Sequence, residues 1–187
     1  MSDDQADSQS QRDEHDRVVQ DWTQNAKRND DENYEFLRSL KNRDYGFEPD
    51  ELTRKLHQQA FEIVDCTRCA NCCKTKTPEF SDEDIDRIAS HLDLEIDAFI
   101  ETYLEVGENG AYRTRQKPCP FLGEDDRCTI YEIRPTVCRD YPYTDKAGLV
   151  HRTMSVANNT QVCPAVFWIV EQMKHEAKAS RRNRKNK

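Results

Sequence analysis

Glycine is scarce in this sequence, with five residues among 187, and no G-x-G-x-x-G stretch occurs. A nucleotide-binding Rossmann-like sheet needs such a glycine-rich turn after a strand. The C-x3-C-x2-C spacing of radical enzymes and the H-E-x-x-H motif of metalloproteases are also absent. These absences argue against a conventional methyltransferase and against a zinc protease.

Long apolar runs are missing as well. The longest, "VCPAVFWIV" at residues 162–170, is roughly half of the ~20 residues that a membrane span needs. The start, "MSDDQADSQS", has neither the basic nor the apolar region of a signal peptide. We therefore expect a soluble, cytoplasmic protein without membrane association. In that reducing compartment, clustered cysteines indicate metal binding or redox chemistry rather than disulfides.

An overall excess of basic residues is also lacking, because the net charge is -8, and affinity for a nucleic-acid backbone depends mainly on cations. We expect no dedicated nucleic-acid binding. Residues 1–35 contain eleven acidic and four basic residues, so residues 1–30 are predicted to be a disordered acidic arm. The end, "RRNRKNK" at residues 181–187, is a basic tail. A solvated helix end is favoured for it over contact with nucleic acid or anionic lipid.

Residues 31–180 are predicted to form one compact domain, mainly α with a small β-hairpin, organised around a cysteine-ligated metal site. Apolar residues recur at helical spacing in several stretches, and Ser81 precedes one of them as a helix N-cap. Helices are predicted at 31–43, 49–65, 82–94, 95–106 and from Pro164, with one or two helical turns at 134–142. We expect the helices at 82–94 and 95–106 to form a helical hairpin. Alternation and β-branched residues predict the β-hairpin from 110–116 and 127–132.

The stretch "CTRCANCCK" at residues 66–74 contains four of the eight cysteines. Two successive C-x2-C steps are the spacing by which short loops surround a metal or an iron–sulfur cluster. Bacterial ferredoxins continue as C-x2-C-x2-C-x3-C-P, but Lys76 stands where the fourth cysteine would be. The fourth ligand must therefore come from elsewhere. Inert reduced cysteines are the alternative, and their density here disfavours it.

The later cysteines lie far apart in the sequence: Cys119, Cys128, Cys138 and Cys163. Cys119 and Cys163 each precede a proline, as the last ferredoxin ligand does. These four contain no second C-x2-C pair of the kind typical of zinc sites. An iron–sulfur cluster (4Fe-4S) is therefore favoured, with zinc or mononuclear iron as the alternative.

Cys72 and Cys73 are adjacent, and adjacent side chains diverge by roughly 100° on a helix. Either one of them stands outside the ligand set, or the eight thiols form two sites. Three bases flank the cluster: Arg68, Lys74 and Lys76. They either offset the negative charge of metal-bound thiolates or form an ordinary solvated surface.

The order of "CTRCANCC", "PCPFL" and "RCTIYEIRPTVCRDYP" resembles the YkgJ-type cysteine-cluster family, a CxxCxxCC zinc- or iron-chelating domain that includes flagellin lysine N-methylases. The resemblance spans about residues 60–165. It implies metal contact by Cys66, Cys69, Cys72, Cys73, Cys119, Cys128 and Cys138, with Cys163 as an addition. Arg134, Arg139 and Tyr141 are motif residues without an established task in the family.

Three functions follow as hypotheses. The first is an iron–sulfur protein with a redox or oxidoreductase role, as the family's members are often labelled, acting with an electron-transfer or protein partner. The second is a structural zinc-binding interaction module, in which the metal orders loops that a small core cannot order alone. The third, lysine N-methylation of a protein, is supported by the resemblance alone.

Overall fold

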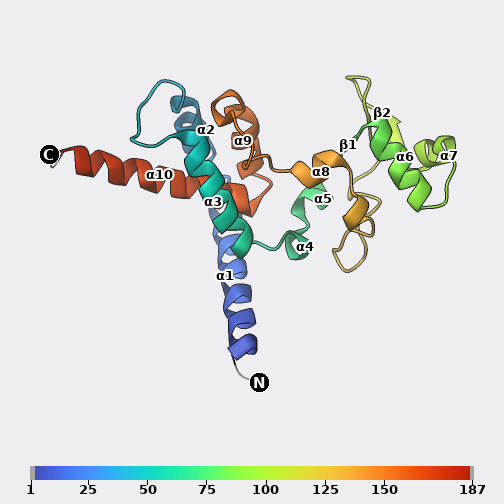
Figure 1. The fold of residues 1–187 in the computed structure, drawn as a ribbon, viewed down its shortest axis with the longest axis horizontal. Coiled ribbons are helices and arrows are strands. Elements are labelled where there is room, and N and C mark those ends of the chain that lie inside the picture. Colours follow the sequence, from blue (N-terminus) through green and yellow to red (C-terminus); the bar gives the residue numbers. More distant parts are fainter. Residues whose placement is uncertain (1–2, 186–187) are drawn as a thin grey trace. The chain divides into compact units, whose positions relative to one another are not determined.

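The chain is built mainly from helices, with one small sheet (Figure 1). A computed structural model describes the backbone of residues 3–185 and the side chains of residues 9–184. Two compact units can be distinguished within it. The first contains the residues up to Cys66 and those from Pro142 onward, and the second is Thr67–Tyr141. The predicted mainly helical fold is confirmed.

The first unit is a set of helices around α10 (Pro164–Lys185), whose first turns contain most of the longest apolar run of the sequence. It packs against α1 (Asp3–Asn25), α2 (Asp30–Ser39), α3 (Pro49–Ile63) and α9 (Thr153–Thr160). A short 3-10 turn, η2 (Leu149–His151), contacts α3 and α9. The buried face of α10 is lined by Ala165, Val166, Phe167, Ile169, Val170 and Met173.

The structure of the acidic N-terminal segment differs from the one that the sequence predicts. The sequence predicts a disordered arm, whereas the structure has helix α1 over Asp3–Asn25. Its second half is anchored to the first unit, because the Trp22 indole donates a hydrogen bond to the Thr160 carbonyl and Ala26 is buried. At the other end α10 continues through the basic stretch to Lys185, and residues 186–187 lie outside the described residues.

Two short helical turns stand at the start of the second unit: α4 (Cys66–Cys69), whose first residue still belongs to the first unit, and α5 (Asn71–Thr75). Strand β1 (Glu79–Phe80) leads into α6 (Asp82–His91) and α7 (Ile96–Tyr103), which pack against each other as predicted. Ser81 caps α6 in a reciprocal capping box with Asp84. The unit ends in a 3-10 turn, η1 (Tyr131–Ile133), and α8 (Thr136–Asp140).

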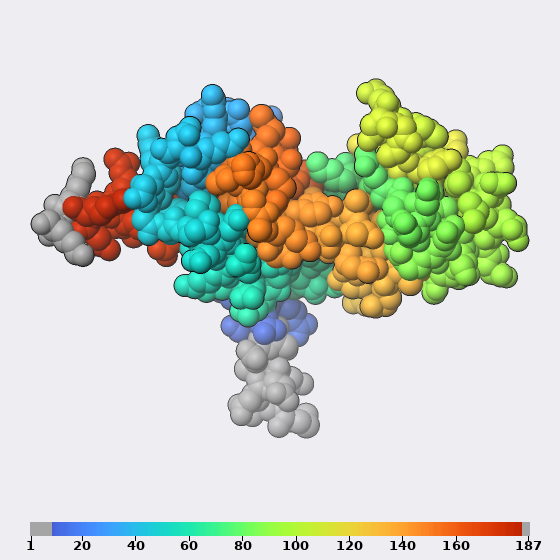
Figure 2. All heavy atoms as spheres, turned by 45° about the horizontal axis from the view of Figure 1, so that its top comes forward, coloured from blue at the N-terminus to red at the C-terminus, as the bar shows by residue number. Residues whose placement is uncertain are grey.

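The sheet has three antiparallel strands in the order β1-β3-β2. β2 (Leu104–Val106) and β3 (Tyr112–Thr114) form the hairpin, with Glu105 opposite Arg113. In Figure 2 the loop that joins them projects from the surface in yellow-green. A hairpin exists as predicted, but its second predicted strand, 127–132, is wrong. β3 already has a neighbour on each side, so no free edge remains for that segment.

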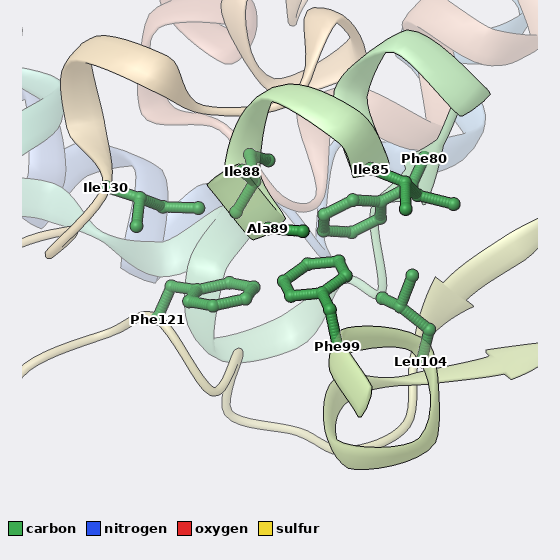
Figure 3. Packing of buried hydrophobic residues seen from close by; sticks show 8 residues of the cluster. All are labelled: Phe80, Ile85, Ile88, Ala89, Phe99, Leu104, Phe121 and Ile130. Carbon is green, nitrogen blue, oxygen red and sulfur yellow. The ribbon is translucent and has the colours of Figure 1, made fainter. Parts of the chain in front are cut away.

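The core of the second unit is an aromatic cluster in which Phe99 packs against both Phe80 and Phe121 (Figure 3). Its ring centroid is 6.2 Å from each of the other two. Helices α6 and α7 supply further apolar residues, and Ile130 comes from the segment before η1. The cysteines at 119 and 128 pack against this core. The core therefore holds the two chain segments that bear them.

No helix among the described residues is both long and apolar enough to cross a bilayer.

Candidate metal centre

All eight cysteines are free thiols. Six belong to the second unit: Cys69, Cys72, Cys73, Cys119, Cys128 and Cys138. Cys66, at the start of α4, and Cys163, buried just before α10, belong to the first unit. Metal contact by Cys66 and Cys163 stays a prediction.

The early cysteines lie on two helical turns separated by Ala70. This residue is buried and has a left-handed backbone, with φ 47° and ψ 8°. The left-handed conformation stops α4 after Cys69 and starts α5 in a new direction. Within α5 the Lys76 amide donates to the Cys72 carbonyl at 2.8 Å, which closes the turn that carries Cys72 and Cys73.

The middle cysteines are positioned by core residues two places further along the chain. Phe121 follows Cys119 and Ile130 follows Cys128, and both side chains are buried in the aromatic cluster. The Thr129 amide donates to the Phe121 carbonyl at 2.8 Å, and Leu122 forms a β-bridge with Cys128. The tight loop between them therefore brings Cys119 and Cys128 to the same side of the core.

Cys138 lies on α8, which is fixed by a buried carboxylate. Asp84 accepts hydrogen bonds from the Thr136 amide at 3.1 Å and from the Thr136 hydroxyl at 3.1 Å. The Arg87 guanidinium also pairs with Asp84 at 2.6 Å. Burial raises the pKa of Asp84, but these hydrogen bonds outweigh it and hold the pKa below its usual value. One carboxylate thus joins the start of α6 to the start of α8.

A main-chain hydrogen bond joins the early and the middle cysteines directly. The Cys119 amide donates to the Cys73 carbonyl, with an N–O distance of 2.8 Å.

Cys73 is the common neighbour of the other five thiols in this unit. Its own pKa is raised, first by a hydrogen bond that its neutral thiol makes with Cys72 and then by burial. Its charge in turn raises the pKa of the thiols that interact with it, in each case after the effect of burial: Cys69, Cys119, Cys128 and Cys138. Four separate chain segments therefore deliver sulfur to one neighbourhood.

Burial and mutual repulsion also act on the later thiols. Burial and the neighbouring charges of Cys73 and Cys128 raise the pKa of Cys119 to about 11. Burial and the same kind of repulsion raise the pKa of Cys138 to about 12. Thiols held together in this way are neutral near pH 7, and a bound cation reverses the balance because it stabilises the thiolates.

Two cations face the thiols. Arg134 lowers the pKa of Cys73, Cys128 and Cys138, against the larger raising effects named above. Its guanidinium lies 3.9 Å from the centroid of the Tyr131 ring and donates to the Tyr131 carbonyl at 2.6 Å, so its position is fixed. Lys74 acts in the same direction on Cys69, and it also pairs with Asp126 at 2.5 Å.

The donor set fits a soft metal centre, because thiolate sulfur is the preferred ligand of zinc and of iron–sulfur clusters. Among the side chains of residues 9–184, no three His, Cys, Asp or Glu residues are already grouped closely enough to hold an ion. The thiols are close enough to interact electrostatically. Metal binding would therefore require rotation about the side-chain bonds of these cysteines.

The adjacent pair differs from the sequence-based expectation. Divergence of neighbouring side chains on a helix predicts that Cys72 and Cys73 point apart, yet their thiols are hydrogen-bonded on α5. The 100° separation applies to the Cα–Cβ bonds, and a staggered χ1 can still bring two neighbouring sulfurs within hydrogen-bonding distance.

Residues 65–164 match the family model CxxCxxCC, described as "Putative zinc- or iron-chelating domain". The match covers more than half of the chain. The chain belongs to this family. The suspected membership is therefore confirmed, and the CxxCxxCC domain spans the second unit and part of the first. Metal binding is supported at the level of zinc or iron.

A curated relative matches part of the chain. The uncharacterized protein MJ0661 of Methanocaldococcus jannaschii is 30% identical over 82 residues, which is 42% of this chain and 44% of the relative. The chain thus spans less than half the length of the curated relative that it matches. No solved structure matches the chain significantly.

Two residues at the CxxCxxCC centre have tasks that sequence reasoning did not assign. Arg134 was noted only as a motif residue, and it is the fixed cation beside three thiols. Asp84 belongs to the first turn of a predicted helix, where its contact with Thr136 could not be foreseen. The S-x-x-D spacing of Ser81 and Asp84 was the one available signal, and it indicates a cap rather than a contact with α8.

Proposed function

We propose that the cysteines of the CxxCxxCC domain hold a 4Fe-4S cluster and that the protein has a redox role. The observation that supports this most is the position of Cys73, whose thiol interacts with all five other thiols of the second unit. When bound, such a cluster supplies a one-electron carrier. The protein residues supply its thiolate ligands and its surroundings.

The number and spread of the thiols favour a polynuclear centre over a single ion. A structural zinc ion takes four ligands, commonly from two C-x2-C pairs. Here six thiols come from four segments of the second unit, and the early segment has the C-x2-C-x2-C spacing of bacterial ferredoxins. We expect four thiols to be the principal ligands, because each of them interacts with the other three: Cys73, Cys119, Cys128 and Cys138.

The charges around the thiols are consistent with such a centre. Thiolate-bound clusters carry net negative charge, and the fixed guanidinium of Arg134 together with Lys74 offsets part of it. The thiols are partly buried and lie beside the aromatic core, and solvent exposure and an apolar surrounding help to set the reduction potential of a cluster.

A structural zinc site is the alternative, since zinc would also tie the four segments together and relieve thiolate repulsion. The two proposals differ in colour and in redox response. The protein should be purified under anaerobic conditions and its visible absorption followed during reduction with dithionite and reoxidation. An iron–sulfur protein is brown and its absorption decreases reversibly. A colourless protein that contains zinc and does not respond to dithionite would refute the redox role.

A further inference from the structure

An open pocket of the second unit lies outside the thiol site. It has a volume of about 350 Å³. Its lining residues come from β2, from β3 and the segment after it, and from the chain that follows α5: Thr77, Glu105, Arg113, Arg115, Gln116 and Lys117. Three of these side chains are cationic and one is anionic. The pocket therefore carries an excess of positive charge in a chain whose net charge is -8.

Two of the cations are held in place by the fold. Arg113 is paired with Glu105 across the β2–β3 hairpin, with a nitrogen–oxygen distance of 2.9 Å. Arg115 donates from Nη2 to the Glu101 carbonyl at 3.0 Å and to the Leu104 carbonyl at 2.6 Å, where α7 ends and β2 begins. Because these guanidinium groups are already ordered, an incoming anion loses little binding free energy in arranging them.

The third cation is available to a ligand. Lys117 is exposed, and within the described residues no ion pair or hydrogen bond engages its ammonium group. Gln116 beside it is exposed as well, and its amide can donate to an oxygen ligand. The volume lies at the lower end of the range of about 300–1,000 Å³ typical of small-molecule pockets. A small molecule fits it, and a folded macromolecule does not.

We propose that this pocket binds a small organic anion through a carboxylate or phosphate group. Arg115 and Lys117 supply the charge that Glu105 does not neutralise, and Thr77 and Gln116 supply neutral hydrogen-bond donors. The pocket borders the thiol-bearing segments in sequence, since Lys117 lies just before Cys119 and Thr77 just after α5. Its binding of an anion does not depend on which metal the thiols hold.

Calorimetric titration of the protein, as purified with its metal, tests this proposal. Sodium phosphate and sodium succinate serve as the probes, with chloride used to match the ionic strength. We expect saturable binding of at least one anion at one site per chain, weakening as salt is added. Tighter phosphate binding assigns a phosphate ligand, and tighter succinate binding assigns a carboxylate.

Variants locate the binding. Lys117→Gln should weaken it about five-fold, and Gln116→Asp, which places an acid in the pocket, should abolish it. Both side chains are exposed, so unchanged circular dichroism is expected. Arg127→Gln removes the same charge from an exposed position of the same unit outside the pocket and should leave binding unchanged. Absence of saturable binding by both anions, or equal weakening by Arg127→Gln, would overturn the proposal.

Discussion

The main-chain amide of Cys119 donates a hydrogen bond to the carbonyl oxygen of Cys73 at 2.8 Å. This bond joins the C-x2-C-x2-C-C segment to the segment that contributes the later cysteines. Because it uses only backbone atoms, we expect it to persist when either thiol is replaced. Loss of metal after a cysteine substitution in this unit can therefore be attributed to the missing sulfur rather than to separation of the two segments.

Replacement of Cys73 by serine should remove most of the bound metal. Its thiol is the common neighbour of the other five in the second unit, and a serine hydroxyl is a poor ligand for soft metals. Cys163→Ser is the matched comparison, since the change is the same but the residue is in the first unit. We expect it to retain more metal. Equal metal content in both purified variants would contradict this ranking.

Removal of the Arg134 charge should make metal loading require a higher pH. Metal binding needs deprotonated thiols, and Arg134 lowers the pKa of three of them. In Arg134→Gln these pKa values rise further, so the pH of half-maximal cobalt or zinc loading should increase by about one pH unit. Arg139→Gln, which removes the same charge from an exposed position on α8, is the control. A similar increase in that variant would show that net charge, rather than position, matters.

Asp84→Asn should destabilise the second unit at neutral pH by about 1–3 kcal/mol. The buried side chain loses its ion pair with Arg87, and its hydrogen bonds from Thr136 no longer end on a charged carboxylate. The folded-state pKa of Asp84 is lowered. Its contribution is therefore fully present above the unfolded-state pKa, about 3.9, and is lost as the pH falls through the folded-state pKa.

Urea unfolding at several pH values checks this dependence. The difference between the wild type and Asp84→Asn should be constant from pH 7 to about pH 5 and should shrink below about pH 4. Asp86→Asn, an exposed acid on the same helix, should have little effect at any pH. A difference for Asp84→Asn that does not depend on pH would show that its ionised form is not what stabilises α8.

The left-handed backbone of Ala70 gives a further prediction. This conformation costs roughly 1–2 kcal/mol for a residue with a Cβ atom, and glycine adopts it freely. Ala70→Gly should therefore bind metal as the wild type does. Ala70→Val, which brings a β-branched side chain to φ 47°, should lower both the metal content and the unfolding temperature. Metal loss of the same size in the glycine variant would show that the turn between α4 and α5 does not depend on this conformation.

The helices of this protein are largely predictable, because their signals are local. Ser81 caps α6 and Pro49 begins α3 as their sequences indicate. The hairpin partner of β3 was missed, since "TYLEV" has the apolar spacing of a helix and the chain passes from α7 directly into β2. Helix α9, with little amphipathic character, had no sequence signal that was recognised.

The candidate site could be predicted in its residue types but not in its grouping. Spacing and family resemblance identified the cysteines as ligands. The interaction of Cys73 with the other five thiols of the second unit depends on the aromatic core, which buries Phe121 and Ile130, and on Asp84, which fixes α8. These are contacts between residues distant in the sequence, and no local pattern encodes them.

Analysis of iron, zinc and acid-labile sulfide in anaerobically purified protein is the most direct test of the proposed centre. The proposal predicts about four iron and four sulfide per chain, the content of one 4Fe-4S cluster. Zinc without sulfide, or a folded protein with fully reduced thiols and neither metal, would contradict it.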